Sequence, residues 1–345
     1  MFESASPPLV ILGVGIIPLD CLYYHEPGAS EPILQEVPGG TITNALCALA
    51  ALGNCEPSLV GVVGDDDAGN RIVNHCKNFG IRTDGLRQKP HGVTRHLRID
   101  LFPRPDVPGE QKVLREFEER CIASPRDIKL GAWWRNALPK LDWLHCDATA
   151  KPVQTMVQQA VSAGKIISFD FGRTARWGMK GPLEILQHVA VLKTNRHLLS
   201  QLLGSAESED GACLFGRFPA LRVALITDAA NGMELLWKSN ATIQRTTRAP
   251  YPVPGGADAL GAGDAALGML IHCLGMTREL WWNGNAGFTE TFATEILSQV
   301  SAISALCCTH RSACGYLLHL REQGKSLLDA LAEIRKNSHR TAYEK

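Results

Sequence analysis

The amino-acid sequence predicts an α/β fold in which a mostly parallel sheet lies between layers of helices. The first observation is segment 9–17 (LVILGVGII), which is apolar at successive rather than alternate positions. That pattern is typical of a strand buried on both faces. The second observation is that strand-like and helix-like segments alternate along most of the 345 residues. Repeated β-α units predict parallel strands with helices on both faces of the sheet.

The individual elements follow in order after the opening strand. Segment 43–52 (TNALCALAAL) is rich in Ala and Leu and ends at Gly53, which favours a helix. The strands expected beyond it are 58–63, 143–146, 166–170, 189–193 and 223–227. The helices expected between and after them are 67–79, 153–163, 182–188, 196–203 and 264–274.

Two stretches interrupt the alternation. Segments 21–38 and 93–119 have shorter, partly alternating patterns with Pro and Gly, which predicts strands outside the main sheet. Because other elements separate these stretches, we expect one domain over residues 1–345 that carries a small β lid. Exposed strand edges in that lid could pair in a homodimer.

The composition excludes several classes of function. Lys plus Arg and Asp plus Glu both number 35, so no net charge attracts nucleic acid or an anionic membrane. No apolar run is long enough to cross a membrane. The 11 cysteines are irregularly spaced and the start MFESASPP lacks a basic signal region, so we expect reduced thiols and a cytoplasmic location.

A glycine-rich turn precedes the last of these predicted helices. Gly261, Ala262 and Gly263 would let backbone N–H groups converge on an anion at the positive end of that helix. Asp264 follows directly, and a carboxylate does not assist phosphate binding, so it is a candidate to accept a proton from an attacking hydroxyl. The alternative is an ordinary helix N-terminus.

A second glycine turn lies near the start of the chain. Gly39 and Gly40 would let a ligand approach the backbone, and Asn44 offers a donor and an acceptor to hydroxyl groups. The alternative is a turn with a helix cap. Asp20 lies just past the expected end of the first strand, where open α/β sheets bind ligands, and its carboxylate suits a polyol.

Taken in order, these residues resemble the ribokinase-like (PfkB-type) carbohydrate kinases. The resemblance covers most of the chain and rests on Asp20 after the opening strand, Gly39-Gly40 with Asn44, segment 64–69 (GDDDAG) and segment 261–264 (GAGD). It implies a Rossmann-like three-layer sandwich with a β lid. It also implies ATP- and Mg²⁺-dependent phosphorylation of a primary hydroxyl of a small-molecule sugar, of ketose or pentose type.

The resemblance also implies a role for each matching residue. Asp264 matches the catalytic base, and residues 261–263 match the anion hole. The implied substrate contacts are Asp20, Gly39, Gly40 and Asn44. Segments 9–20 and 143–147 (WLHCD) are most similar to ketohexokinase and fructokinase-like members, which adds Asp147 to those contacts. The nucleotide is expected along the loops that contain Asn195, Thr227 and Gly232.

The chain departs from the family pattern at three places. Asn195 is followed by Arg196, His197 and Leu198, so the usual glutamate of Asn-x-x-Glu is missing. Thr-x-Gly is replaced by a Thr-Asp-Ala sequence at 227–229, and the threonine expected at 259 is Ala. These departures keep open a catalytically silent protein that binds a sugar or nucleotide. A nucleoside kinase is the other alternative, because the same fold with the same loops could phosphorylate a nucleoside.

A group of cysteines near the C-terminal part of the sequence suggests a metal at first sight. Cys307, Cys308, His310 and Cys314 lie within eight positions. Adjacent cysteines on a helix point in different directions, and no second Cys-x-x-Cys pair completes a tetrahedral set. We therefore expect packed thiols here, and the sequence assigns no metal ligand.

Overall fold

A computed structural model describes residues 7–103, 111–117, 123–172, 184–203, 210–239, 242–253, 258–282 and 288–343. Its main sheet has nine strands in the spatial order β13-β12-β11-β10-β9-β8-β1-β4-β5. Neighbours from β5 to β11 run parallel, whereas β12 and β13 pair antiparallel at one edge. The strands are β1 (Leu9–Val14), β4 (Cys55–Gly64), β5 (Arg82–Lys89), β8 (Trp143–Cys146), β9 (Ile166–Phe171), β10 (Val191–Asn195), β11 (Val223–Thr227), β12 (Met233–Ser239) and β13 (Thr242–Arg248).

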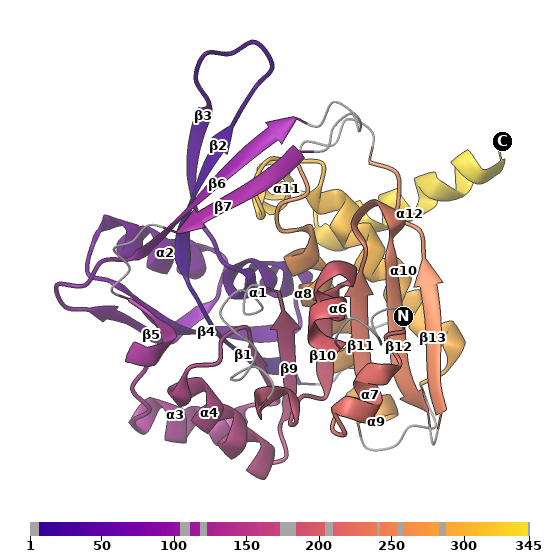
Figure 1. The fold of residues 1–345 in the computed structure, drawn as a ribbon, viewed down its shortest axis with the longest axis horizontal. Helices are drawn as coiled ribbons and strands as arrows, with labels where there is room; N and C mark the ends of the chain where they lie inside the picture. Colours follow the sequence, from indigo (N-terminus) through magenta and orange to yellow (C-terminus); the bar gives the residue numbers. More distant parts are fainter. Residues whose placement is uncertain are drawn as a thin grey trace.

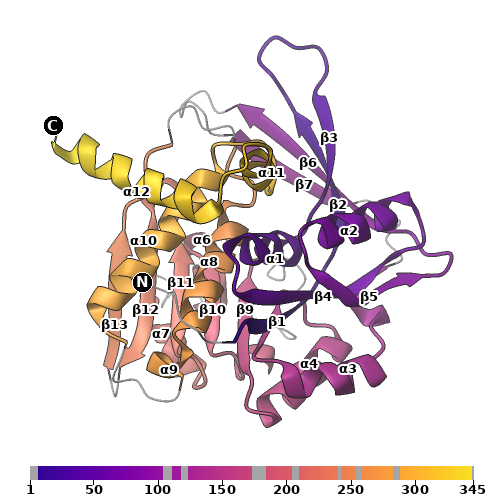
Figure 2. The same cartoon turned by 180° about the vertical axis from the view of Figure 1, so that it is seen from behind.

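Helices cover both faces of this sheet (Figure 1, Figure 2). One face carries α1 (Thr41–Leu52), α2 (Asp67–Asn78), α8 (Ala262–Met276), α9 (Arg278–Trp281), α10 (Glu290–Cys307), α11 (Gly315–Glu322) and α12 (Leu327–Tyr343). The other carries α3 (Ala132–Ala137), α4 (Lys151–Ser162), α6 (Arg196–Leu203) and α7 (Cys213–Arg217). Short 3₁₀ turns lie at η1 (Pro125–Asp127), η2 (Leu138–Lys140) and η4 (Ala229–Asn231).

The central strand β1 explains why the sequence is apolar at successive positions. Leu9 and Ile11 belong to the hydrophobic core on the α1 and α8 side, whereas Leu12 and Val14 belong to the core on the α4 side. Side chains of a strand alternate between faces, and both faces are covered here, so both sets must be apolar.

A separate sheet has the order β3-β2-β6-β7. It consists of β2 (Pro18–Tyr24), β3 (Ile33–Pro38), β6 (Arg95–Pro103) and β7 (Gln111–Phe117). Its β2–β3 hairpin projects from the body (Figure 1). Leu22, Leu97 and Ile99 on this sheet pack with Leu260, which precedes α8, so the sheet is tied to the start of that helix.

The predicted fold class is confirmed, since a mostly parallel sheet lies between helices and a small second sheet stands beside it. The strands of the second sheet fall largely within segments 21–38 and 93–119, of which residues 104–110 and 118–119 lie outside the described residues. The single-domain extent of 1–345 and the lid role stay predictions. The helix expected at 182–188 lies partly outside the described residues.

Several expected boundaries differ from the structure by a few residues, and the end of the opening strand matters most for the site. The opening strand ends at Val14 rather than near residue 17, because the Ile16 amide donates to Asp147 Oδ1 at 3.2 Å instead of extending the ladder. The chain then enters β2 at Pro18. Asp20 therefore lies inside a strand of the second sheet and not in a loop after β1.

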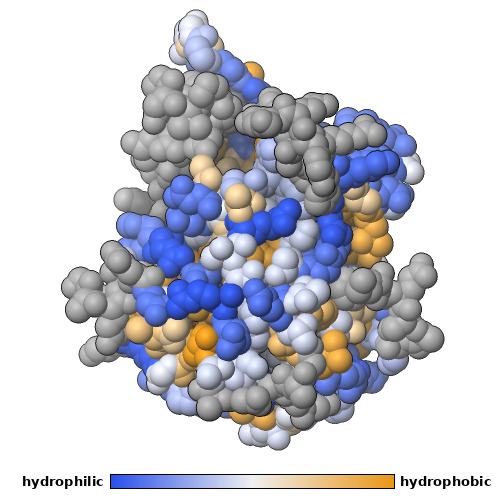
Figure 3. Space-filling view, turned by 90° about the vertical axis from the view of Figure 1, so that its right-hand side faces the viewer, coloured by the Kyte–Doolittle hydropathy of each residue, from blue (hydrophilic) through white to orange (hydrophobic). Residues whose placement is uncertain are grey.

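The described residues on the face seen in Figure 3 form no large apolar patch. There the described apolar side chains form small separate groups among hydrophilic ones. None of the described helices is long and apolar enough to cross a membrane.

Candidate active site

The turn before α8 places Asp264 in the first turn of a helix. Gly261 adopts a left-handed conformation with φ of 81° and caps the helix. A Cβ atom on Gly261 would lie 2.3 Å from the Cβ of Ala313, so only glycine fits there. Asp264 is partly exposed, which leaves its carboxylate accessible to a ligand.

The backbone amides of this turn are not all available. The Ala262 amide donates to Ala259 at 3.3 Å, and the Asp264 amide donates to Gly261 at 2.9 Å. Among the described residues, the amides of Gly261 and Gly263 have no such backbone partner. The donors left for an anion at this helix N-terminus are therefore those of the two glycines.

A buried lysine lies against the same turn. Lys193 on β10 pairs with Asp170 on β9 at 3.0 Å, and the two side chains are 10% and 2% exposed. A Cβ atom on Gly263 would lie 3.0 Å from Lys193 Nζ. The turn thus combines a helix N-terminus with a fixed positive charge, which suits a phosphate.

Sequence reasoning missed this lysine, although a signal was present. Lys193 and Asp170 are the single charges in two otherwise uncharged strands, VLKTN and IISFDF. Buried charges are rare unless they are paired. Two opposite charges at the same end of neighbouring parallel strands therefore indicate an ion pair at the ligand-binding edge.

Asn44 on α1 joins the two glycine turns. Its Nδ2 donates to Asp264 Oδ2 at 2.8 Å. The helix that carries Asn44 begins after Gly40, whose φ is 93° and where a Cβ atom would lie 2.5 Å from the carbonyl oxygen of Ile16. The structure therefore brings Asn44 directly onto Asp264, and Gly40 is required for the turn that allows it.

Asp20 lies directly against Gly39. Asp20 is buried, and a Cβ atom on Gly39 would lie 2.0 Å from its Oδ2. The Gly39 amide donates to the Pro18 carbonyl at 3.0 Å, which holds the turn beside β2. Gly39 is thus the residue that makes room for the Asp20 carboxylate.

Asp147 also lies against a glycine. It follows β8 and is 2% exposed, and a Cβ atom on Gly15 would lie 1.9 Å from its Oδ1. That oxygen accepts the hydrogen bond from Ile16, so Asp147 shapes the chain between β1 and β2.

The three residues expected at the nucleotide lie at one end of the sheet. Asn195 and Thr227 are paired across β10 and β11, and Gly232 follows in the turn before β12. Asn195 Oδ1 accepts from the Leu198 amide at 2.9 Å and so caps α6. Gly232 has φ of 97° and a Cβ atom there would lie 2.1 Å from the Arg248 carbonyl oxygen, so this turn also needs glycine.

A further carboxylate organises the approach to α8. Asp258 accepts hydrogen bonds from the Tyr24 hydroxyl at 2.9 Å, the Leu260 amide at 2.7 Å and the Ser312 amide at 3.2 Å. Burial raises the pKa of Asp258 against the lowering effect of these donors. This residue ties the second sheet to the turn, a role that the sequence did not indicate.

Comparisons with known proteins find sequence similarity to carbohydrate kinases. The model of the family described as pfkB family carbohydrate kinase matches residues 9–99. The bifunctional protein HldE of Proteus mirabilis is 28% identical over 291 residues, which cover 78% of this chain and 56% of that protein. A fructokinase of Vibrio alginolyticus is 26% identical over 257 residues, covering 71% of this chain and 79% of that enzyme. This chain therefore spans only about half the length of HldE.

Solved structures extend the match to the fold. The ribokinase of Arabidopsis thaliana, solved with ribose and ATP, aligns over 96% of this chain and 99% of its own, with a TM-score of 0.69 and 17% identity. The fold is thus that of the ribokinase-like proteins. The match at residues 9–99 and the fructokinase relative agree with the predicted resemblance: this chain is similar to the PfkB-type carbohydrate kinases.

Proposed function

We propose that this protein transfers the γ-phosphoryl group of ATP to a primary hydroxyl of a sugar. The observation that carries the proposal is the contact between Asn44 and Asp264 at 2.8 Å, which joins both glycine turns into one site. A partly exposed carboxylate beside an anion-binding turn has the chemistry that phosphoryl transfer needs.

The turn before α8 fits a phosphate group. The Gly261 and Gly263 amides, the helix N-terminus and the Lys193 ammonium all favour negative charge there. Mg²⁺ bound together with ATP would supply positive charge that offsets the charge of the phosphates. We assign no protein ligand to that ion.

Asp264 would act as the base. As the phosphoryl group leaves ATP, the attacking hydroxyl becomes acidic, and Asp264 takes its proton. The hydrogen bond from Asn44 fixes the carboxylate in one orientation, so little reorganisation is needed at the moment of transfer.

The sugar would be held beside this carboxylate. Its hydroxyls would contact Asp20, Gly39, Gly40, Asn44 and Asp147, and buried carboxylates bind hydroxyl donors through charge-assisted hydrogen bonds. The fructokinase relative supports a sugar of ketose or pentose type. The ribokinase solved with ribose has the same fold.

The nucleotide would extend along Asn195, Thr227 and Gly232. The carboxyl ends of β10 and β11 lie side by side there, and open α/β sheets bind ligands at such ends. Since the Oδ1 atom of Asn195 caps α6, its NH₂ group is the donor that would face a phosphate or ribose.

A catalytically silent binder is the second candidate. The glutamate usual after Asn195 is absent, and Arg196 pairs instead with the buried Glu234 at 2.9 Å. A nucleoside as the acceptor is the other alternative within the same fold.

One experiment separates these functions. The purified chain is incubated with ATP, Mg²⁺ and a panel of ketoses, pentoses and nucleosides, and ADP and phosphorylated products are measured. A phosphorylated sugar is the expected result, and a phosphorylated nucleoside would replace the sugar as acceptor. If no product forms while calorimetry detects sugar or ATP binding, the silent binder is the correct reading.

We also propose a homodimer through the second sheet. Ile33 and Leu34 at the start of the edge strand β3 are each 51% exposed, and large exposed apolar side chains on an edge strand favour association. Sedimentation of the wild type and of an Ile33→Lys, Leu34→Lys variant tests the dimer, since only the wild type should dimerise.

We also propose a cytoplasmic location. It fits the use of ATP and the free thiols of the described cysteines.

A further inference from the structure

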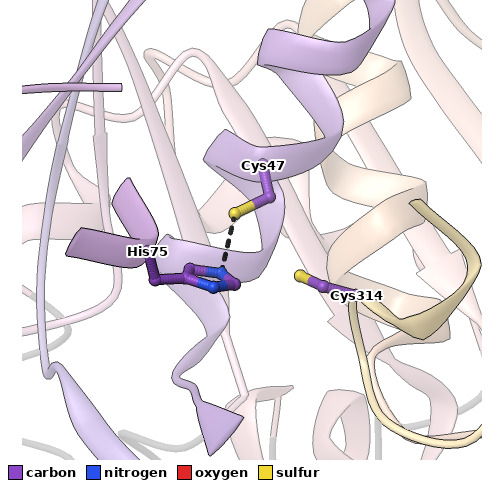
Figure 4. Close-up of side chains that lie close together, drawn as sticks. All are labelled: Cys47, His75 and Cys314. Atoms are coloured by element: carbon purple, nitrogen blue, oxygen red, sulfur yellow. Dashed lines mark hydrogen bonds between the residues drawn. The ribbon is translucent and has the colours of Figure 1, made fainter. Parts of the chain in front are cut away.

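Three metal-ligating side chains from distant parts of the sequence meet beside the candidate active site. Cys47 lies on α1, His75 on α2 and Cys314 at the cap that precedes α11 (Figure 4). Cys47 Sγ lies 3.5 Å from His75 Nε2, and the ligand atoms of all three residues lie within 4.8 Å of one another. Both sulfur atoms point toward the imidazole ring (Figure 4).

This cluster differs from the one considered in the sequence. Cys307 is a packed thiol as expected, since its Sγ faces the carbonyl oxygens of Leu260 and Ala313 at 3.5 and 3.6 Å. Cys314 points elsewhere, toward residues 47 and 75. The sequence could not reveal this set, because its members are 28 and 239 positions apart and meet only through the packing of α1, α2 and the α11 cap.

The donor set suits a soft divalent cation. Zn²⁺ binds Cys sulfur at about 2.3 Å and His nitrogen at about 2.0–2.1 Å, usually with tetrahedral geometry. Such bonds hold the donor atoms roughly 3.5–3.8 Å apart, so the observed cluster needs only a small contraction. Two thiolates and one imidazole leave a fourth position for water, as in open zinc sites.

The cluster can be reached from a cavity. His75 is partly exposed. It lines a small cavity together with Cys314, Asp20 and Leu260, so an ion can reach the cluster from that side.

We propose that Cys47, His75 and Cys314 form a Zn²⁺ site, with water from this cavity as the fourth ligand. Binding displaces the thiol protons to solvent, because the metal binds thiolates. Zn²⁺ binding also breaks the contact between Cys314 Sγ and Asn44 Oδ1, which lie 3.7 Å apart. Since Asn44 holds Asp264, Zn²⁺ at this site should inhibit phosphoryl transfer; this consequence rests on the proposed function.

Cobalt reports on the site without any activity assay. Co²⁺ is added to the reduced, metal-free full chain, and a thiolate-to-cobalt charge-transfer band is expected at one equivalent, with loss of the band when Zn²⁺ is added. The band should disappear in a Cys47→Ala, Cys314→Ala variant and weaken in His75→Gln. Cys76→Ala is the matched control, because Cys76 is a buried thiol next to His75 on the same helix, and it should keep the band.

Three results would overturn the site: no band in the folded wild type, an unchanged band in the double cysteine variant, or loss of the band in Cys76→Ala. Circular dichroism checks that each variant is folded. If the double cysteine variant does not fold, His75→Gln tests the site instead, because residue 75 is partly exposed. Inhibition is measured separately as product formed with and without Zn²⁺, in the wild type and in His75→Gln. If the chain binds Co²⁺ but makes no product, the result supports the metal site and contradicts only the proposed kinase function.

Discussion

The side-chain amide of Asn44 donates to the carboxylate of Asp264 at 2.8 Å across 220 positions of sequence. The contact depends on how closely α1 and α8 pack. A Cβ atom on Gly268 would lie 2.8 Å from the Ala45 carbonyl oxygen and 2.9 Å from the Ala48 Cβ, so glycine lets the two helices approach. The orientation of the proposed base is therefore set by helix packing as well as by its own turn.

The first prediction concerns Asp264. Asp264→Asn keeps the shape of the side chain but cannot accept a proton, so kcat should fall by about 10²–10⁴-fold while the KM for the sugar stays within a few-fold. Steady-state kinetics with the best sugar of the panel measure both constants. Near-normal turnover in the variant would remove Asp264 as the base.

The second prediction concerns Asp20 and the glycine beside it. Asp20→Asn should raise the sugar KM by roughly 10- to 100-fold, since it weakens charge-assisted hydrogen bonds present in both ground and transition states. Gly39→Ala should raise KM in the same direction, because its Cβ would displace the Asp20 carboxylate. An unchanged KM in both variants would contradict a role in sugar binding.

The third prediction separates stability from catalysis at Lys193. Lys193→Met removes the charge that faces Asp170 in the interior, and breaking a buried pair on one side costs about 3–5 kcal/mol. The double variant Lys193→Met, Asp170→Leu should recover much of that stability, because neither charge of the pair then stays buried without its partner. Activity should stay low in the double variant, since the phosphate has lost its positive charge. Urea unfolding and kcat are the two measurements; recovered activity in the double variant would argue against a role in phosphate binding.

The fourth prediction is a loss of stability in mild acid caused by two buried histidines. Burial, with the Lys193 charge as a second cause, lowers the pKa of His145 to about 3, and burial lowers that of His272 to about 4. The unfolded chain takes up protons below pH of about 6.5, whereas the folded chain does not. Stability is thus fully present above that pH and is lost as the pH falls toward 3–4.

The size of this effect can be measured by urea unfolding at pH 7, 5.5 and 4.5. For His145 alone, the loss by pH 4.5 should be on the order of 2–3 kcal/mol. His145→Gln should flatten the pH dependence of the unfolding free energy, whereas His188→Gln, at an exposed position, should leave it unchanged. Equal slopes in the wild type and His145→Gln would contradict the prediction.

The sequence by itself determined the fold class and most of the elements. Strands 143–146 and 223–227 and helix 196–203 have the expected bounds, because apolar runs and helix periodicity are local properties of the chain. The second sheet was predictable from its alternating pattern. The glycine turns at 39–40 and 261–263 were predictable for the same reason, since a tight turn shows as a local glycine signal.

The tertiary structure alone decided which side chains meet. It placed Asp20 within β2, joined Asn44 to Asp264 and set Lys193 beside Gly263. It also separated Cys314 from Cys307 and directed it toward Cys47 and His75. These contacts link residues far apart in sequence, and their geometry follows from packing between helices and sheets, which no local pattern encodes.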